Sequence, residues 1–217
     1  MSDPKESAET WRSFSPSPAK FGEQLRPAIL SVLALTLLTG VAFPLLLFAV
    51  AWPIFPRQAR GSLIRRSGIV IGSELIGQEF TRPEYFQSRP SAAGNGYDGT
   101  ASGGTNLGPN NPKLVSGSAE FPGIRQLVEE YRQRNSLASK VAIPIDAVTR
   151  SGSGLDPHIS LANALLQVPR VARARGLSEG AVHRLVTDHL EGRQFGFLGS
   201  PRVRVLELNL ALDKLPK

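Results

Sequence analysis

The chain has 217 residues, with 25 Lys and Arg against 18 Asp and Glu, so its net charge is +7. The length allows one domain with an appendage or two small domains, and a hydrophobic content of 41% is too high for a wholly disordered chain. The absence of cysteine excludes a disulfide scaffold, a zinc–thiolate site, an iron–sulfur cluster and a cysteine nucleophile, and the basic residues form no run typical of a nucleic-acid-binding tail.

The N-terminal part of the sequence predicts a flexible tail followed by one membrane anchor. Residues 1–26 mix charged side chains with Ser and Pro and show little apolar patterning, which favours a tail. Residues 27–56 carry no charge, and their apolar centre at 29–52 would form a helix of about 36 Å, long enough to cross a hydrocarbon core of about 30 Å. We expect Pro44 to bend this helix.

Two other interpretations of this apolar segment fit less well. A buried core helix of this length would show a polar face, which this segment lacks. A cleaved signal peptide usually has an apolar core of about 7–15 residues, which is shorter than this one. An uncleaved anchor is therefore the favoured interpretation.

The charges that flank the anchor give a weak signal for its orientation. Counting Lys and Arg slightly favours a cytoplasmic location for the C-terminal side, by four residues to three. A margin of one residue does not decide the orientation. The residues counted are Arg12, Lys20 and Arg26 before the anchor and Arg57, Arg60, Arg65 and Arg66 after it.

Residues 57–217 predict one domain that mixes strands and helices. Short β-like runs come first, at 62–78, and a loop rich in Gly, Asn, Ser and Pro follows at 88–122. An extended segment or strand is expected at 141–149. Between the loop and that segment a helix is predicted, because apolar residues recur at helical spacing at Ile124, Leu127, Val128 and Tyr131.

The last part of the domain predicts two further helices and a final strand. Asp156 is suited to cap a helix, which should run toward Gly176 with a kink or break at Pro169. Alternating leucines predict a strand at 203–212. Ser178 can cap the intervening helix, whose apolar positions are Val182, Leu185, Val186 and Leu190. The expected fold class is thus α+β, with a single N-terminal transmembrane helix followed by one mixed α+β soluble domain.

A turn rich in serine and glycine, here named the serine–glycine turn, precedes the second predicted helix of the domain. Glycines before a helix can present backbone N–H groups to an anion, although the Gly-Lys-Ser/Thr sequence of a Walker loop is missing. Ser, Asp and His all occur in it, but adjacency in sequence is no sign of triad geometry. The alternative is a tight turn that enters a capped helix. Its residues are Ser151, Gly152, Ser153, Gly154, Leu155, Asp156, Pro157 and His158.

A second candidate, the glycine–asparagine loop, lies within the long loop. Its glycines allow unusual backbone angles and its asparagines can bond to neighbouring backbone, so it could clasp a partner or an ion through carbonyl groups. A set of solvent-exposed turns is an equally good interpretation. The candidate residues are Ser102, Gly103, Gly104, Asn106, Gly108 and Pro109.

The remaining polar residues do not predict catalysis or a metal site. His183 and His189, near Glu191, are six residues apart, unlike the i, i+4 spacing of a zinc motif on a helix. The sequence shows no nucleophile paired with a base and no phosphate-binding lysine motif. We therefore expect no catalytic residue, no metal site and no cofactor of the chain's own.

Taken together, several segments resemble the C subunit of the Kdp-type potassium-transporting P-type ATPase of prokaryotes. They cover nearly everything from residue 60 to residue 213 and follow a single N-terminal anchor. The N-terminal tail is longer than the family leads us to expect, and Arg150 and Arg204 stand where less basic residues are expected. The matching segments are 72–80, 85–92, 102–109, 148–160, 170–176, 198–205 and 208–213.

The resemblance implies an accessory role in a larger complex. In that family this subunit accompanies a channel-like potassium-binding subunit and a P-type ATPase subunit that forms the phosphorylated intermediate. The subunit is described as assembling the complex and raising ATP affinity, so ATP, Mg²⁺ and potassium would be handled by the assembled complex. The resemblance also implies a single-pass protein of the prokaryotic cytoplasmic (inner) membrane, with its N-terminus in the cytoplasm and residues 57–217 in an extracytoplasmic position.

An exterior domain conflicts with direct nucleotide binding. The serine–glycine turn would then be unable to touch cytoplasmic ATP, and an effect on ATP affinity would need conformational coupling across the membrane. One alternative is a membrane-tethered extracytoplasmic binding module for an anionic ligand, which would use the positive charge of the domain. Another is a tethered hydrolase in which His158 activates Ser151 or Ser153.

Overall fold

The computed structural model describes residues 21–215 and divides into two compact units, with the boundary between Ala59 and Arg60. One stretch of the first unit, Phe21–Ile54, is the only helix among the described residues that is long and apolar enough to cross a membrane. This agrees with the predicted single N-terminal anchor. The unit consists of helix α2 (Phe21–Leu37), the π-helical turn η1 (Leu38–Ala42), α3 (Phe43–Ile54) and the short α4 (Pro56–Ala59).

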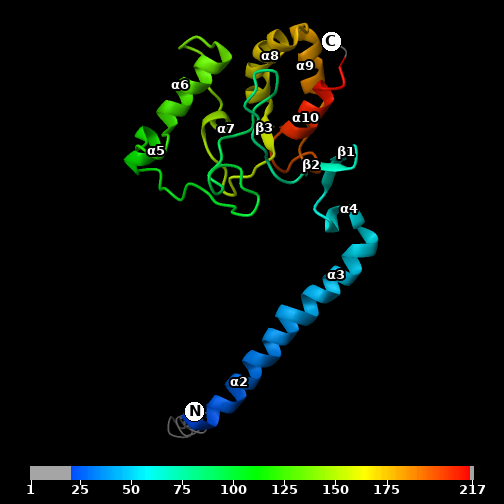
Figure 1. The fold of residues 1–217 in the computed structure, drawn as a ribbon. Helices are drawn as coiled ribbons and strands as arrows, with labels where there is room; N and C mark the ends of the chain where they lie inside the picture. The colour runs from blue at the N-terminus through cyan, green and yellow to red at the C-terminus, as the bar shows by residue number, and fades with distance from the viewer. Residues whose placement is uncertain (1–20, 216–217) are drawn as a thin grey trace, which may run out of the picture. The chain divides into compact units, whose positions relative to one another are not determined.

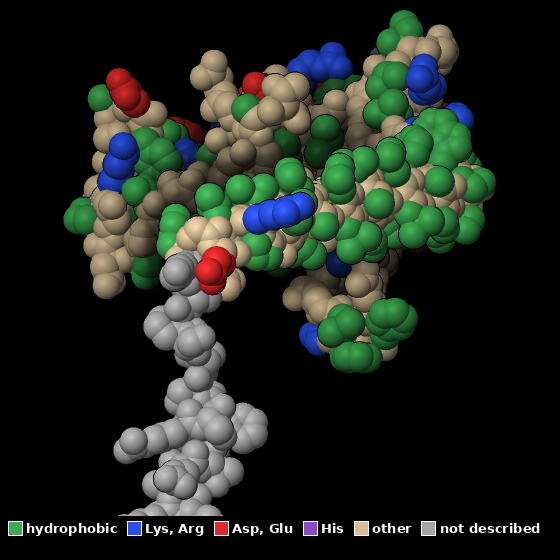
Figure 2. All heavy atoms as spheres, turned by 90° about the horizontal axis from the view of Figure 1, so that it is seen from below, with side chains coloured by type: hydrophobic (Ala, Val, Ile, Leu, Met, Phe, Trp, Pro, Cys, Tyr) green, Lys and Arg blue, Asp and Glu red, His purple; other side chains and the backbone are tan. Residues whose placement is uncertain are grey.

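The long helix begins at Phe21, six residues before the predicted start of the anchor at residue 27. Most of the predicted tail, residues 1–20, lies outside the described residues. No residue of α2, η1 or α3 is buried. Figure 2 shows hydrophobic side chains covering the visible side of this helix, with charged ones near its beginning. The charged residues of α2 are Glu23 and Arg26.

Pro44 explains the π-helical turn that precedes it. A proline inside a helix lacks an N–H donor, and its ring collides with the carbonyl four residues earlier, here that of Gly40. In η1 the N–H of Phe43 donates to the carbonyl of Leu38, five residues back, so the turn is wider just before the proline. The helix therefore passes the proline without ending.

The second unit is a mixed α+β domain, as predicted (Figure 1). Its strands form a two-stranded antiparallel hairpin and a three-stranded antiparallel sheet in the order β3-β5-β4. The strands are β1 (Leu63–Arg66), β2 (Ile69–Ser73), β3 (His158–Ser160), β4 (Leu190–Glu191) and β5 (Arg202–Arg204). The helices are α5 (Pro112–Ser116), α6 (Ile124–Asn135), α7 (Ile145–Val148), α8 (Leu161–Arg175), α9 (Glu179–Asp188) and α10 (Val205–Leu212).

The main core lies where the three-stranded sheet meets α8, α9 and α10. A smaller cluster joins α6 to α7 through Tyr131, Ala147 and Val148. The serine–glycine turn connects α7 of the smaller cluster to β3 of the larger one, so both ends of the turn are held by packed elements. The main core contains Phe86, Ile159, Ala164, Val168, Val171, Ala172, Val182, Val186, Val203, Val205, Leu208 and Leu212.

An extended segment outside the strands crosses the core and is held by amide side chains. Asn209 of α10 accepts a hydrogen bond from the Phe86 N–H at 2.8 Å and donates one to the Phe86 carbonyl at 2.9 Å. Gln167 of α8 does the same for the next residue, Gln87, at 2.7 and 3.2 Å. Both amide residues are 1% exposed, so they replace the neighbouring strand that this buried backbone would otherwise need.

Several local predictions are confirmed. The β-like runs at 62–78 form the β1–β2 hairpin, joined by Ser67 and Gly68, whose positive φ angles of 52° and 82° are typical of a type I′ turn. The predicted amphipathic helix is α6. Ser178 caps α9 through its side chain, and Gly176, with a φ of 68°, follows the end of α8.

The prediction that Asp156 caps a helix is wrong. α8 begins at Leu161, and its N-cap is Ser160, whose hydroxyl accepts a hydrogen bond from the Asn163 N–H. The residues before it form β3, because they pair with β5, a strand far along the chain that local sequence does not reveal. α8 also continues through Pro169 to Arg175, without a break at the proline.

The prediction of a strand at 203–212 is also wrong, because β5 is short and α10 follows it directly. Val205, Leu208 and Leu212 are buried, and their spacings of three and four residues are those of a helix face. Asn209, on the same face, supplies the amide that holds the extended segment. Leu210, which a strand would place on the same face as Leu208 and Leu212, is only partly buried in the helix.

The segment at 141–149 differs in part from the predicted strand or extended segment. It contains the short helix α7, which begins after Pro144. Ala147 and Val148 of this helix are buried in the smaller cluster. Thr149, which follows the helix, does have extended backbone, and it leads into the serine–glycine turn.

Candidate functional site

The serine–glycine turn is bonded to two other loops through its backbone. The N–H of Gly103 and the hydroxyl of Ser102 donate to the carbonyl of Ser153 at 2.9 and 3.0 Å. The hydroxyl of Ser91 donates to the carbonyl of Gly154 at 2.6 Å. The structure thus brings together the turn and the first residues of the glycine–asparagine loop, although no sequence pattern connects them.

Close backbone approach explains two of the glycines at this junction. Gly154 has a φ of 69°, and a Cβ atom placed on it would lie 2.5 Å from the Gly103 carbonyl oxygen. A Cβ on Gly104 would lie 2.8 Å from the Gly152 carbonyl oxygen. Gly152 itself has open space around the position of a Cβ. The backbone contacts therefore require glycine at 154 and 104 but not at 152.

The later residues of the glycine–asparagine loop do not join this junction. Asn106, Gly108 and Pro109 are exposed. Within residues 21–215, no hydrogen bond links any of these three to the serine–glycine turn. Asn106 has a φ of 52°, and the carbonyl of Gly108 accepts a hydrogen bond from Asn111 at 3.0 Å. These are local turns, and their place in a partner contact stays a prediction.

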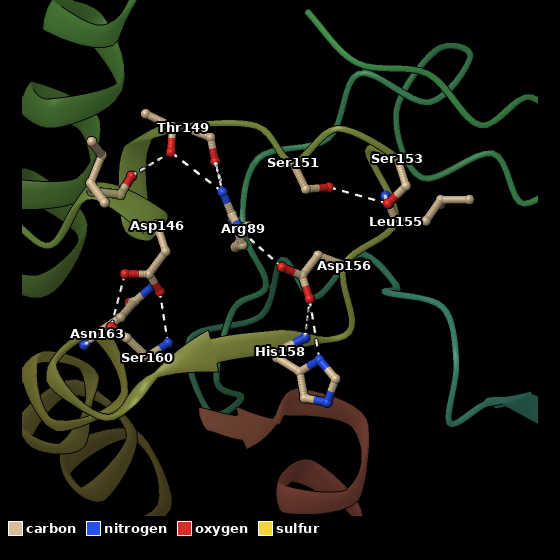
Figure 3. Close-up of polar contacts among 11 residues, drawn as sticks. Arg89, Asp146, Thr149, Ser151, Ser153, Leu155, Asp156, His158, Ser160 and Asn163 are labelled. Atoms are coloured by element: carbon tan, nitrogen blue, oxygen red, sulfur yellow. Dashed lines mark hydrogen bonds and ion pairs between the residues drawn. The ribbon is translucent and has the colours of Figure 1, made fainter. Parts of the chain in front are cut away.

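Asp156 holds the shape of the turn (Figure 3). One carboxylate oxygen accepts a hydrogen bond from Arg89 Nη1 at 2.8 Å. The other accepts one from the backbone N–H of His158 at 3.0 Å and lies 3.2 Å from the His158 Nδ1 atom. Arg89 also donates to the Thr149 carbonyl at 3.4 Å, so one guanidinium bridges both ends of the turn.

The same contacts set the charge of this carboxyl group. Burial alone would raise the pKa of Asp156, but hydrogen bonds from His158 and Arg89, together with the positive charge of Arg89, lower the pKa to about 2. Asp156 is therefore ionised at neutral pH. It acts as a hydrogen-bond acceptor and is not available as a general acid.

The other side of the His158 ring faces a network of charges on the sheet. Its Nε2 atom lies 3.8 Å from an oxygen of Glu191. Glu191 also pairs with Nε of Arg202 at 3.1 Å and Nε of Arg204 at 2.6 Å, and Arg204 reaches Glu207 at 3.2 Å. These contacts connect β3, β4 and β5 to the start of α10. Arg204, which departs from the pattern expected from the resemblance, thus has a structural role.

The N-terminus of α8 is occupied by a side chain of the same domain. The carboxylate of Asp146 accepts hydrogen bonds from the N–H and hydroxyl of Ser160, both at 2.8 Å, and from the amide of Asn163 at 3.0 Å (Figure 3). An anionic ligand at this helix end would have to displace that carboxylate. This geometry argues against the anion-binding interpretation of the turn.

The two serines of the turn are not paired with its histidine. The Oγ atoms of Ser151 and Ser153 are 3.3 Å apart, and the Ser153 Oγ accepts the N–H of Leu155 at 3.1 Å. His158 lies on the other side of Asp156 from both serines (Figure 3), and no hydrogen bond among the described residues joins it to either one. A serine nucleophile needs a base within hydrogen-bond reach, and His158 does not provide it here.

Sequence reasoning missed the side chains that hold the turn from a distance. Arg89 is 67 residues from Asp156, and no spacing rule links them. The only signal was that Arg89 and Ser91 fall within a segment that carries the family resemblance. Arg150, the other departure from the expected pattern, lies over the ring of Phe121, with 4.2 Å between its Cζ atom and the ring centre, and burial lowers the pKa of its guanidinium.

An open hollow of about 440 Å³ lies beside the turn. Its charged side chains are balanced in sign, and the structure already gives them internal partners, such as Asp156 for Arg89 and Glu191 for Arg202. Among the described residues there is no group of three His, Asp or Glu placed to hold a metal ion. The polar lining residues include Arg89, Asp146, Asp156, His158, Ser160 and Arg202.

A different surface, between β4 and β5, exposes large apolar side chains. Residues 192–199, here named the aromatic loop, carry Phe195 and Phe197, which are 87% and 68% exposed. Backbone hydrogen bonds of 3.0 and 2.9 Å between Gln194 and Leu198 close the loop, and Phe195 has a φ of 51°. Neighbouring exposed aromatic residues on a closed loop are typical of an interaction surface. No motif or periodicity in the sequence marks this loop.

These features define a class of protein. It is a membrane-anchored α+β protein whose serine–glycine turn is hydrogen-bonded to other loops of the same chain. The family model for KdpC, described as the K⁺-transporting ATPase c chain, matches residues 25–214. A Mycobacterium tuberculosis protein named potassium-transporting ATPase KdpC subunit is 52% identical over 192 residues, covering 88% of this chain and 98% of its own length. A Sorangium cellulosum protein of the same name is 53% identical over 190 residues, covering 87% and 96%. The chain therefore belongs to the KdpC family of K⁺-transporting ATPase subunits.

Proposed function

We propose that this chain is the accessory, non-catalytic subunit of a high-affinity, ATP-driven potassium uptake complex. It assembles and stabilises a channel-like subunit and an ATP-hydrolysing subunit, and it supports ATP binding by the latter. The observation that carries the proposal is the long helix Phe21–Ile54, in which no residue is buried by the chain itself. The exposed rings of the aromatic loop offer a second surface for a partner.

The anchor is proposed to pack against membrane helices of the partners. Thr36 and Gly40 are four residues apart on one face, where small side chains let another helix approach closely. Replacing residues 27–56 with an unrelated anchor should weaken co-purification of the two partner subunits and reduce potassium transport. Gly40→Leu should have the same effect, whereas Gly22→Leu, outside the apolar centre, should not. If the chain with the exchanged anchor still co-purified fully with the partner subunits and supported full transport, the helix would serve only to attach the domain to the membrane.

The domain is proposed to lie outside the cytoplasm and the N-terminus inside it, as the resemblance implies. Because the chain has no cysteine, a single Ser116→Cys on the exposed end of α5 would carry the only thiol. A membrane-impermeant maleimide should label it in intact cells, whereas Ser7→Cys should react only after lysis. The reverse labelling pattern would place the domain in the cytoplasm and overturn the proposed topology.

Support of ATP binding is then an indirect effect. With the domain outside, the serine–glycine turn acts on nucleotide affinity only by favouring one conformation of the assembled complex. The purified chain should hydrolyse neither ATP nor esters. Ser151→Ala, Ser153→Ala and His158→Ala should change at most the behaviour of the complex. Robust turnover by the isolated chain, abolished by one of these changes, would instead support the hydrolase interpretation.

A membrane-tethered module for an anionic ligand is the competing function. It would purify alone, whereas an accessory subunit should co-purify in fixed proportion with two large membrane proteins. The internal carboxylate at the start of α8 favours the accessory subunit, because it fills the place that an anion would take.

A further inference from the structure

The segment that follows the anchor concentrates positive charge. Between Glu23 and Glu74 the sequence contains no acidic residue at all. Basic residues are not depleted there, since four arginines follow the anchor within a few residues of one another. They are Arg57, Arg60, Arg65 and Arg66.

Two of these arginines lie on an exposed hairpin beside aliphatic side chains. Arg65 and Arg66 of β1 are exposed, and their partners across the hairpin are Val70 and Ile69. Ile69 is 69% exposed, Val70 43% and Leu63 44%. An arginine thus stands directly opposite an exposed aliphatic residue at both of these positions.

The hairpin contacts the rest of the domain both next to its turn and near the end of β2. Arg66 forms an ion pair with Asp213 at 3.3 Å, and a Cβ on Gly72 would lie 2.8 Å from a methyl group of Leu206. Near the Ser67–Gly68 turn, the side chain of Arg65 donates a hydrogen bond to the Gly68 carbonyl at 3.3 Å. Arg65 and the turn residues Ser67 and Gly68 are nevertheless exposed in the isolated chain.

The covalent chain limits how far this hairpin can lie from the end of the anchor. Residues 55–62 separate the end of α3 from the start of β1, and such a length spans at most about 30 Å even when fully extended. A headgroup layer adds roughly 5–8 Å to each side of the hydrocarbon core. The hairpin consequently remains within reach of the headgroups on whichever side the domain lies.

We infer that the β1–β2 hairpin binds the anionic phospholipid headgroups of the leaflet in which the anchor ends. Guanidinium groups pair with phosphate oxygens in a two-point geometry. Basic segments next to an anchor are attracted to anionic lipid. The aliphatic side chains beside Arg65 and Arg66 match the apolar boundary beneath the headgroups.

The absence of acidic residues favours a lipid over a protein as the occupant. Protein interfaces are enriched in aromatic residues, and in this domain the aromatic loop, with Phe195 and Phe197 exposed, fits that description better than the hairpin, which has no aromatic residue. Lipid binding also explains the arginines after the anchor without reference to the orientation of the anchor in the membrane. The excess of one Lys or Arg on the C-terminal side of the anchor then no longer argues for a cytoplasmic domain.

Docking can be measured on the full chain with one label. Ser67→Cys, at the hairpin turn of this cysteine-free protein, would carry an environment-sensitive fluorophore. The labelled chain is placed in nanodiscs of phosphatidylcholine alone or mixed with increasing phosphatidylglycerol. We expect the label to move into a less polar environment as phosphatidylglycerol increases, and high salt to reverse this shift by screening the charges.

Matched variants distinguish headgroup binding from a general charge effect. Arg65→Gln, which leaves the Arg66–Asp213 pair intact, should lower the apparent affinity for anionic lipid about fivefold, and Arg65→Gln with Arg66→Gln should lower it further. Arg125→Gln with Arg184→Gln removes two charges from exposed positions on α6 and α9 and should change nothing. An equal response to neutral and anionic discs would overturn the inference, as would equal losses in the hairpin and control variants. Protection of the label only in the complete complex would show a protein occupant instead.

Discussion

The serine–glycine turn and the aromatic loop differ in how conspicuous they are in the sequence and in how much of their surface is free to contact another molecule, and the two properties run in opposite directions. The turn is conspicuous in the sequence, yet hydrogen bonds from Ser91, Ser102 and Gly103 occupy its backbone. The aromatic loop has no conspicuous pattern, yet it exposes Phe195 and Phe197. A run of glycines here marks a place where backbones of one chain meet. The surface left for another molecule lies elsewhere.

The largest expected effect separates two glycines of the same turn. Gly154→Ala should destabilise the domain by about 3 kcal/mol, because its positive φ strains any other residue and the new Cβ would meet the Gly103 carbonyl. Gly152→Ala, with open space around it, should cost less than about 0.5 kcal/mol. Denaturant unfolding of the full chain in detergent measures both. Similar losses in the two variants would show that the turn is not held by backbone packing.

The next prediction concerns the aromatic loop. Phe195→Ser with Phe197→Ser should leave the unfolding free energy of the isolated chain within about 0.5 kcal/mol, since both rings are exposed. Binding to the partner subunits should weaken roughly 30-fold if the rings are central to the interface. The readout is co-purification at limiting subunit concentration. Phe48→Ser, on the anchor, serves as a comparison, because it changes the packing of the anchor helix in the membrane and leaves the aromatic loop intact. Unchanged recovery with the loop variant would remove this loop from the interface.

Acid should weaken the turn in a defined range. Because the pKa of Asp156 is lowered to about 2, its contribution to stability is fully present above about pH 4 and is lost as the pH falls toward 2. The two-unit difference corresponds to about 2.5 kcal/mol, which partial exposure of the carboxyl group reduces to about 1.5 kcal/mol. Asp156→Asn should remove this step from a plot of stability against pH. Asp188→Asn, an exposed residue of α9, should leave the step in place.

The smallest effect distinguishes the two serines of the turn. Ser153→Ala should cost about 1 kcal/mol, because its hydroxyl accepts the Leu155 N–H. Ser151→Ala should cost less than about 0.5 kcal/mol, since within residues 21–215 its hydroxyl is hydrogen-bonded only to that of Ser153, at 3.3 Å. Unfolding midpoints of the two variants, measured side by side, check the order. A larger loss at Ser151 would show that the bonding pattern of the turn is assigned wrongly.

Elements that depend on local rules could be predicted from the sequence. The anchor, the amphipathic helix α6 and the Ser178 cap follow from hydropathy, periodicity and capping chemistry. The start of α8 and the end of β5 could not be placed, because the short sheet forms only by pairing residues that are far apart. The candidate site was predicted in part. Its two loops were found, but the Arg89–Asp156 pair that holds them has no local signature.

The amide side chains of Asn209 and Gln167 also fix the order in which the domain can fold. They bind Phe86 and Gln87 over separations of 123 and 80 residues. A chain still in synthesis has the extended segment long before it has either amide, so the backbone of Gln87 has no such partner before residue 167 exists, and that of Phe86 has none before residue 209 exists. The last helix is therefore the element that closes the domain. A chain that stops before residue 209 would leave the middle of the molecule unfolded rather than merely shortened.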